Sequence, residues 1–376
     1  AAHLPADIRD KVTGYRHLSK DDYIRWHKIL AAKGWSVPHW PVEWGGTGWN
    51  ITQRYIYDEE FGLAGAPGLP PFGPAMCASV LHRFGTPEQK ARFLPRIREG
   101  DDFWVQGYSE PGAGSDLAAL KCRADRQGDH YLVNGQKIWT TLGHYGDWIF
   151  CLVRTDAAAE KRQEGISFLL IDMATPGITV RPLQTIAGGF EVNEVFFDDV
   201  ELPVANLVGQ ENKGWDYAKF LLGNERTNIA RVGMSKERIR RVRELASKVE
   251  ANGKPLIEDD RFREKLAATE IELKALELSV MRVIANETKN GKGKPDPASS
   301  ILKIKGSDIQ QTISELLVEV AGPFAAPYIP EEGIGNEEAG WESHTAPHYF
   351  NYRKVSIYGG SNEIQRGIIA KAVLGL

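Results

Sequence analysis

The residues best suited to chemistry lie in two neighbouring segments of the chain. Residues 106–116 read Gln-Gly-Tyr-Ser-Glu-Pro-Gly-Ala-Gly-Ser-Asp, and residues 137–141 read Lys-Ile-Trp-Thr-Thr. Glycines let a backbone approach a ligand closely, and successive N–H groups can face an anion. Gly112-Ala113-Gly114 alone is typical of a plain surface turn, because a dinucleotide fingerprint needs a third glycine between a strand and a helix. Only the joint spacing of the two segments indicates a ligand site.

Both segments fall in a region with the alternating pattern of β-strands. Asn134-Gly135 predicts a hairpin turn, with residues 137–141 as the return strand. Short strands separated by turn residues predict a compact antiparallel barrel or sandwich. Further strands are expected at residues 148–155, 165–173, 178–186 and 192–202.

Helical periodicity governs the part of the chain that precedes this region. Ser19 and Thr86 are expected N-caps, each at the start of a helix, and Pro87 suits the first helical position. Two further helices are expected at residues 51–63 and 75–84. The intervening residues 65–74 are too rich in proline and glycine for regular structure, which predicts a loop.

Helical periodicity returns after the strands and continues to the end of the chain. Apolar residues repeat with the helical period over residues 213–249, 261–290 and 298–320, and a shorter helix follows Ser361. This pattern predicts an antiparallel bundle. The fold class is therefore α+β, with an N-terminal helical domain (1–105), a middle antiparallel β-barrel or sandwich domain (106–210) and a C-terminal antiparallel helical bundle (211–376).

Composition excludes several classes of protein. The net charge of −4 gives no electrostatic case for binding nucleic acid. No apolar run approaches the roughly 20 residues that span a bilayer, so no membrane partner is expected. Three scattered cysteines suit a reducing compartment, which predicts the cytoplasm. The chain starts without a charged-then-apolar leader, and its abrupt start leaves open a missing N-terminal helix.

Taken together, the glycine-rich turn and the Lys-x-Trp-x-Thr strand resemble the acyl-CoA dehydrogenase family. The resemblance covers essentially the whole chain. Residues 194–200 and 212–215 are similar to the exit of the family's β domain, and residues 357–366 to its C-terminal signature. Within the family, residues 44–49 and 214–226 resemble the large subunits of pimeloyl-CoA dehydrogenases.

The resemblance implies an activity, a cofactor and partners. Family members bind FAD between the sheet and the bundle. They remove the α-hydrogen of an acyl-CoA as a proton and pass the β-hydrogen as hydride to the flavin. The implied product is a trans-2-enoyl-CoA, and the electrons pass to electron-transfer flavoprotein. A dimer or tetramer, homomeric or heteromeric, is expected. The subfamily resemblance favours a medium-length acyl group such as pimeloyl, while chain length, branching and a terminal carboxylate stay open.

The resemblance also implies site residues by position. The Ser109 hydroxyl is expected to bond the flavin ring, Trp139 to flank it, and the Thr141 hydroxyl to lie near its N5 atom. Ser115 matches the serine that meets the CoA moiety. Ser361 and Glu363 match positions near the FAD adenylate, often supplied by the neighbouring subunit. The implied cofactor residues are Gln106, Ser109, Trp139, Thr141, Ser361 and Glu363, and the implied substrate residues are Ser115 and Arg226.

The catalytic base departs from the usual position in the family. Most members carry a glutamate just before a Gly-Thr pair, where this chain has Gly359, and glycine cannot take a proton. A minority carry the base before an arginine on the first long bundle helix, and Glu225 before Arg226 fits that arrangement. Burial beside Phe220 and Leu221 would raise the carboxyl pKa and make Glu225 a stronger base. Arg226 lies about 100° further round such a helix, so it can face the CoA instead.

Two further departures keep other functions open. Glu319 stands in the turn where the family places a glutamine near pyrophosphate, and Arg261 is a poor match to the usual Arg-x-x-Phe-Gly. Both favour a non-catalytic partner subunit of a heteromeric dehydrogenase, which the intact Ser109, Trp139 and Thr141 oppose. A third alternative is a flavin oxidase of similar fold, which would form peroxide.

Residues 324–352 form a long insertion rich in proline and aromatic residues. His344 and His348 within it are spaced to bind a metal only if they lie on a helix. Pro347 lies between them and argues against a helix, so the sequence predicts no metal site.

Overall fold

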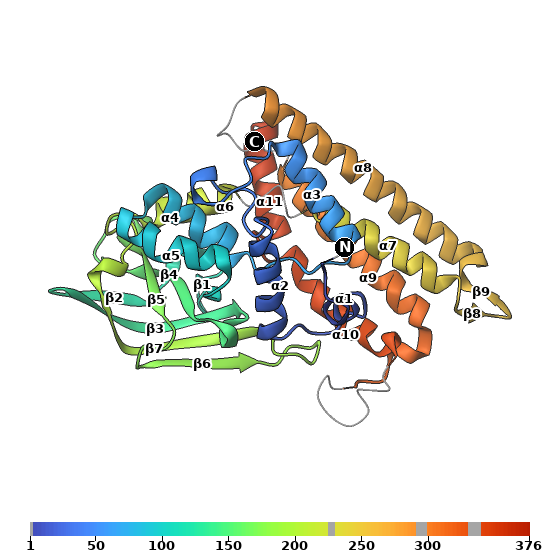
Figure 1. Ribbon diagram of the computed structural model, residues 1–376, viewed down its shortest axis with the longest axis horizontal. Coiled ribbons are helices and arrows are strands. Elements are labelled where there is room, and N and C mark those ends of the chain that lie inside the picture. Colours follow the sequence, from blue (N-terminus) through green and yellow to red (C-terminus); the bar gives the residue numbers. More distant parts are fainter. Residues whose placement is uncertain (1–2, 225–229, 291–298, 330–339) are drawn as a thin grey trace.

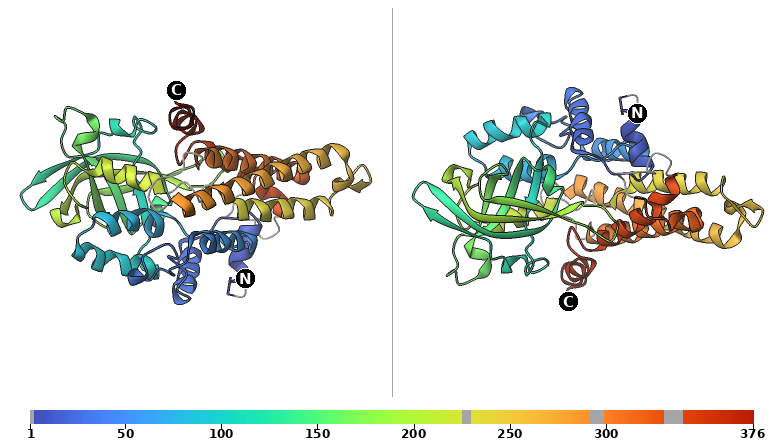
Figure 2. Two further views of the ribbon diagram at one scale, coloured as in Figure 1. Left: turned by 90° about the horizontal axis from the view of Figure 1, so that it is seen from above. Right: turned by 90° about the horizontal axis from the view of Figure 1, so that it is seen from below.

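The computed structural model describes residues 3–224, 230–290, 299–329 and 340–376. A curled sheet forms one end of the molecule and a bundle of long helices the other, with the N-terminal helices packed across their junction (Figure 1). The N-terminus and the C-terminal helix lie on opposite faces (Figure 2). None of the helices in the described ranges is both long and apolar enough to cross a membrane.

Five helices form the N-terminal part, and their starts follow the predicted caps. The Ser19 and Thr86 side chains each accept a hydrogen bond from the backbone N–H three residues on, and Pro87 is the first residue of its helix. The predicted loop at residues 65–74 is wrong at its end, because Phe72–Cys77 forms a π-helical turn that continues into the next helix. The helices are α1 (Ala6–Thr13), α2 (Lys20–Ala32), α3 (Ile51–Leu63), α4 (Ala78–Phe84) and α5 (Pro87–Glu99).

Seven strands form one mixed sheet, which confirms the predicted fold class while adding parallel pairs. β4 and β5 are buried along almost their whole length, so they read as continuous apolar runs. β1 pairs in parallel with β4, and β3 pairs antiparallel with both β2 and β7. The strands are β1 (Trp104–Gly107), β2 (Arg123–Gln127), β3 (His130–Thr141), β4 (Trp148–Arg154), β5 (Ile166–Asp172), β6 (Ile178–Leu183) and β7 (Val192–Pro203).

The predicted hairpin at Asn134-Gly135 is wrong, because both residues lie inside β3. The turn into β3 is made at Gly128, whose φ is 65°. The Asn134 amide exchanges two hydrogen bonds of 2.9 Å with Asp199 on β7, so it stabilises strand pairing rather than a turn. Gly135 sits at a register shift, and a Cβ there would lie 2.7 Å from the Cα of Cys122. Its glycine therefore permits a close approach at a bulge.

The bundle contains the predicted long helices, with one difference. The region predicted as one helix over residues 213–249 is described as α6 (Gly214–Asn224) and α7 (Val232–Ala246), and residues 225–229 lie outside the described ranges. A short β-hairpin, β8 (Glu250–Ala251) and β9 (Lys254–Pro255), follows α7. The remaining helices are α8 (Asp260–Asn290), α9 (Ser299–Ala321), α10 (Thr345–Tyr352) and α11 (Asn362–Ile369).

The expectation that Pro347 prevents a helix is wrong. Pro347 is the third residue of α10, where its missing N–H and fixed φ are tolerated because first-turn N–H groups have no helical partner. His348 therefore lies on a helix, but its ring packs between aromatic rings 4.3 Å away, those of Tyr15 and Tyr352. Within the described ranges, no three histidine, cysteine, aspartate or glutamate side chains come close enough to hold a metal ion.

One glutamine fastens the N-terminal helices to the end of the sheet. Gln89 on α5 is 5% exposed, and its Nε2 donates hydrogen bonds of 2.8 Å to the carbonyls of Ala205 and Leu207, which follow β7. Neither carbonyl belongs to a ladder of paired strands, where a backbone N–H would donate to it. The Gln89 side chain supplies the hydrogen-bond donor instead.

Replacing Gln89 with leucine should destabilise the protein by about 1–3 kcal/mol, because two carbonyls lose their donors without a gain in volume. Chemical denaturation measures the effect, with Gln163→Leu at an exposed site as the control. Equal unfolding midpoints for the two variants would contradict the role of Gln89.

Candidate active site

A buried ion pair joins the glycine-rich turn to the strand that carries Trp139. Lys137 is fully buried on β3, and its Nζ lies 2.7 Å from Glu110 Oε1. The same ammonium donates to the carbonyls of Leu152 at 2.7 Å and Tyr108 at 3.3 Å. All three N–H groups of the ammonium thus have an acceptor, which is the condition under which a buried charge is tolerated.

The Glu110 carboxylate organises the turn around it. It accepts hydrogen bonds from the backbone N–H groups of Lys121 at 2.6 Å and Cys122 at 2.9 Å. Its own backbone N–H and carbonyl both bond Ala113, which closes the turn at 2.9 Å on each side. The glycine-rich turn is therefore fixed by one carboxylate.

Ser109 lies directly beside the strand of Trp139 and Thr141. Its carbonyl accepts a hydrogen bond of 2.9 Å from the backbone N–H of Ile138, and its side chain is partly exposed. Three of the predicted flavin residues, Ser109, Trp139 and Thr141, are thus brought together. Gln106 on β1, three residues earlier in the chain, is also partly exposed.

Trp139 is held in an unusual position on β3. Its φ is 62°, it lies at a register shift against β7, and 60% of its surface is exposed. A left-handed conformation costs a bulky residue roughly 1–2 kcal/mol. Lys137 and Thr140 on either side are buried, so the bulge turns an indole ring outward from an otherwise packed strand. Residues held in such strained conformations cluster at ligand-binding sites, so this ring is a candidate ligand contact.

Neighbouring residues hold the end of β3 that carries Thr141. Asn193 on β7 is buried and donates from Nδ2 to the Thr140 carbonyl at 2.9 Å, while its Oδ1 lies 3.0 Å from His144 Nδ1. The Leu142 N–H donates to the Glu191 carbonyl at 2.7 Å. Thr141 itself is partly exposed.

The supporting side chains Glu110, Lys137 and Asn193 were missed in the sequence analysis. One signal was available for Lys137, because a lysine inside an apolar strand implies a buried partner. Ser115, the predicted CoA contact, lies exposed on the outer part of the turn.

The predicted adenylate residues lie elsewhere, at the start of α11. The Ser361 hydroxyl accepts from the backbone N–H of Ile364 at 3.4 Å, and Glu363 is exposed in the first turn. Bonds to its own backbone N–H and to Ser361 lower the pKa of Glu363. Buried Lys303 on α9 donates to Asn362 at 2.9 Å. In the described parts of the chain, no hydrogen bond joins α11 to the turn of Ser109; α11 instead begins against α9, and the C-terminal end of the chain projects from the molecule (Figure 2).

The position of the family's usual base holds an exposed glycine. Gly359 has a φ of 66°, and Gly360 after it a φ of 81°, so this turn uses two left-handed residues. The predicted base Glu225 and its neighbour Arg226 lie outside the described residues. Glu319 stands where the family has a glutamine near the pyrophosphate. Its carboxylate pairs with Lys265 on α8 at 2.9 Å.

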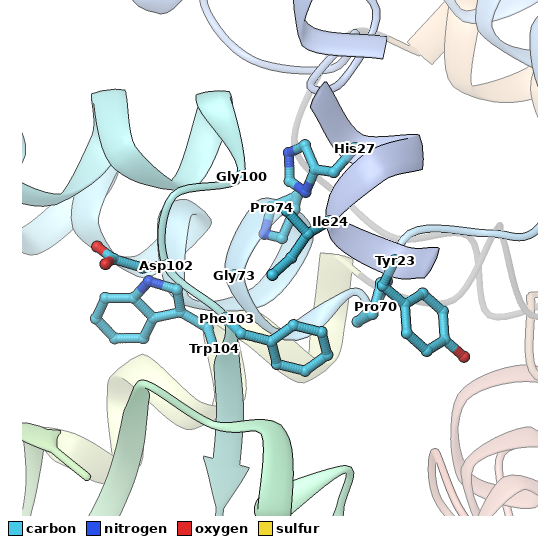
Figure 3. A pocket seen from close by; sticks show the side chains of 10 residues that line it. All are labelled: Tyr23, Ile24, His27, Pro70, Gly73, Pro74, Gly100, Asp102, Phe103 and Trp104. Atoms are coloured by element: carbon cyan, nitrogen blue, oxygen red, sulfur yellow. The ribbon is translucent and has the colours of Figure 1, made fainter. Parts of the chain in front are cut away.

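Two hollows are separate from these residues. The small one, between α2, the π-helical turn and β1, has room for about one water molecule at 20 Å³ (Figure 3). Burial lowers the pKa of the His27 imidazole, which lines this hollow. An open groove of 630 Å³ lies over Arg92, Trp148 and Asp172. Neither is lined by a predicted site residue.

Family comparison covers nearly the whole chain. Three family descriptions match in order: acyl-CoA dehydrogenase, N-terminal domain, over residues 8–101; middle domain, over 106–200; and C-terminal domain, over 212–374. The chain belongs to the acyl-CoA dehydrogenase family. It is thus an enzyme, an oxidoreductase acting on acyl-CoA, and the family prediction made from the motifs is confirmed.

Similar proteins of this family come from mycobacteria and from solved complexes. Acyl-CoA dehydrogenase IpdE1 of Mycobacterium tuberculosis is 37% identical over 366 residues, covering 96% of this chain and 90% of the relative. A chain of the ChsE4-ChsE5 complex from the same species has a TM-score of 0.84 at 33% sequence identity. The match covers 100% of this chain and 94% of that one. A chain of the Tcur3481-Tcur3483 steroid ACAD has a TM-score of 0.84 at 30% sequence identity. The match covers 99% of this chain and 93% of that one. The finer likeness to pimeloyl-CoA dehydrogenase stays a prediction.

Lys137→Met should destabilise this acyl-CoA dehydrogenase by about 3–5 kcal/mol, because it leaves the Glu110 carboxylate buried without a counter-charge. Denaturant unfolding at an unchanged m value measures the loss. Lys161→Met is the control, since Lys161 forms an exposed pair with Glu164 that should contribute about 0–1 kcal/mol. The double variant Lys137→Met, Glu110→Leu should recover part of the loss. A single variant as stable as the control would contradict the role of the pair.

Proposed function

We propose that the chain catalyses FAD-dependent α,β-dehydrogenation of an acyl-CoA to the trans-2-enoyl-CoA. The observation that carries the proposal is Trp139, an exposed indole ring on a strained bulge beside Ser109. Acyl-CoA dehydrogenases generally bind FAD, and the residues here fit it: an aromatic wall next to uncharged hydroxyl groups, with no acid at the ring positions. When bound, FAD supplies the acceptor for the β-hydrogen.

Each residue of the set then has a role that its position supports. Ser109 and Gln106 donate uncharged hydrogen bonds to the flavin ring, and Thr141 supplies a hydroxyl near its reacting edge. Trp139 covers the ring and excludes water. Ser115, exposed on the turn, meets the CoA moiety, as does Arg226.

The proposed base is Glu225, since Gly359 offers no carboxylate. Its task is to remove the α-proton while hydrogen bonds to the thioester carbonyl stabilise the developing negative charge. The Gly359-Gly360 turn favours an alternative, a non-catalytic partner subunit, because a subunit without a base needs another chain to act.

The proposed partners are electron-transfer flavoprotein and further subunits. Ser361 and Glu363 serve the adenylate end of FAD, across a subunit boundary. Exposed apolar residues on and after α11, Ile364, Val373 and Leu374, support contact with another chain in a dimer or tetramer. A relative that forms the ChsE4-ChsE5 complex makes a heteromer a natural form. The three cysteines, free and buried, support the cytoplasm as the compartment.

The acyl group is proposed to be either medium-length and dicarboxylyl or steroid-derived. The first follows from the likeness to pimeloyl-CoA dehydrogenase, and the second from similarity to a protein named steroid ACAD. Both of these acyl groups are larger than a short straight-chain acyl group.

Purified protein reconstituted with FAD should show flavin absorbance that bleaches anaerobically on addition of an acyl-CoA. A panel of straight-chain, dicarboxylyl and steroid-side-chain thioesters identifies the substrate class. Protein that binds no flavin would exclude the proposal. Bound flavin that no thioester bleaches, except with a second subunit present, would favour the partner-subunit alternative, and peroxide formation would reveal an oxidase.

Glu225→Gln should keep FAD and bind acyl-CoA but reduce flavin at least roughly 10²-fold more slowly, the low end for a general base. Gly359→Glu added to this variant should restore part of the rate if both positions face one α-carbon. Recovery is expected to be partial, because a non-glycine residue at the left-handed φ of Gly359 costs about 1–2 kcal/mol. Near-normal reduction by Glu225→Gln would assign the base to another group.

A further inference from the structure

An arginine without a carboxylate partner lies where α7 meets α10. Arg238 donates from Nη2 to Tyr352 Oη at 2.5 Å, and its guanidinium carbon lies 4.4 Å from the centre of the same ring. Its Nη1 is buried, and no residue in the described ranges accepts a hydrogen bond from it. Among those residues, no ion pair joins Arg238 to an acid, and its chain neighbour Glu237 lies 3.5 Å from Arg240 instead.

Three neutral side chains lie beside Arg238, and the one acid that acts on it electrostatically is its chain neighbour Glu237. His348 and Tyr352 come from α10, and Tyr15 from the segment between α1 and α2. Burial and the charge of Arg238 hold the pKa of His348 well below its usual range, so the imidazole is neutral. Burial raises the pKa of Tyr15 to about 12, so its hydroxyl keeps its proton. Tyr15, Arg238, His348 and Tyr352, here named the Arg238 cluster, thus carry one positive charge.

A second arginine on α7 also carries a buried N–H group without an acceptor. Arg241, one helical turn after Arg238, has a buried Nε with no acceptor in the described part of the chain, although its Nη1 lies 3.7 Å from Glu244 Oε1. Buried unpaired N–H groups on guanidinium ions are costly, and the cost is removed by an anion that accepts from them. Guanidinium geometry matches a carboxylate, which can take two N–H groups at once.

The Arg238 cluster lies on the side of the bundle that meets the flavin strand. Arg238 and Tyr352 both act electrostatically on Tyr358, the residue before Gly359, and so does Glu191. The Glu191 carbonyl bonds Leu142, which follows Thr141. Lys354 on the segment after α10 pairs with Glu191 at 2.5 Å, which ties this part of the bundle to the sheet. Because Lys354 follows Tyr352 by two residues, this ion pair brings the Tyr352 end of the cluster toward the strand end that carries Thr141.

We propose that the Arg238 cluster binds a carboxylate carried by the acyl group, at the end remote from the thioester. The proposal rests on the proposed function and sets its substrate class, because it favours acids over methyl-ended chains. Arg238 Nη1 supplies the charged donor, and Tyr352 and His348 supply uncharged hydrogen-bonding groups beside it. A steroid-derived acid and a dicarboxylyl chain share this chemistry.

The test compares ω-carboxyl acyl-CoAs with methyl-ended acyl-CoAs of the same chain length, measuring kcat/KM for anaerobic flavin reduction. The unaltered enzyme should prefer the acid. Arg238→Gln should lower kcat/KM for the acid by roughly 10–100-fold, the range for hydrogen bonds to charged groups, and leave the methyl-ended substrate nearly unchanged. Arg243→Gln, at an exposed site on the same helix where the arginine pairs with Glu270 on α8, is the matched control and should change neither. A steroid-side-chain acid and its decarboxylated analogue form the second arm.

The outcomes separate this proposal from the proposed function. No flavin reduction by any thioester would contradict the dehydrogenase proposal. If the unaltered enzyme reduces its flavin at equal rates with acid and methyl-ended substrates, only the carboxylate site is overturned. This comparison uses no variant, so misfolding of Arg238→Gln cannot affect it. An equal loss with both substrates in Arg238→Gln would also overturn it, because Arg238 would then support the fold instead of selecting the acid.

Discussion

The ion pair between Lys137 and Glu110 is the constraint on which the candidate site depends. It connects β3, the carbonyl of Leu152 on β4, and the N–H groups that lead into β2. A buried pair of this kind contributes little stability relative to an apolar pair, because desolvation offsets the attraction. Its effect is geometric: a hydrophobic pair could fill the same space, but it could not accept from Cys122 and Lys121 while holding the strand.

The rest of the site follows from this fixed turn. With the turn and β3 held together, the backbone of β3 bulges at Trp139 and turns the indole ring out of the packed sheet. Asn193 then holds the next peptide, and the chain takes a second left-handed conformation at Leu142, just after the strand. The sheet thus provides a rigid surface on which we propose that the flavin ring binds. In the proposed arrangement the bundle provides the charged groups at a distance from it, which separates ring binding from recognition of the acyl group.

Several elements could be predicted from sequence because local chemistry decided them. The N-caps at Ser19 and Thr86 and the apolar strands β4 and β5 needed only neighbouring residues to specify them. Ser109, Trp139 and Thr141 could be grouped from their spacing. Asn134 could not be placed, since its amide bonds Asp199 on another strand, and this tertiary contact overrides the turn preference of Asn-Gly. The prediction that Pro347 prevents a helix was wrong because the sequence did not reveal that α10 begins at Thr345, which places the proline in the first turn.

The pairing of β3 has a consequence for how the chain is made. β2 pairs with β3 across a tight turn, but Thr140 meets its partner Asn193 53 positions later. At about 5–20 residues per second, a ribosome needs about 3 to 10 s to synthesise that interval. During those seconds one edge of β3 carries unpaired backbone groups and an outward tryptophan, the kind of edge that other nascent chains can join. The arrival of β7 therefore ends the period in which the emerging chain is most prone to aggregate.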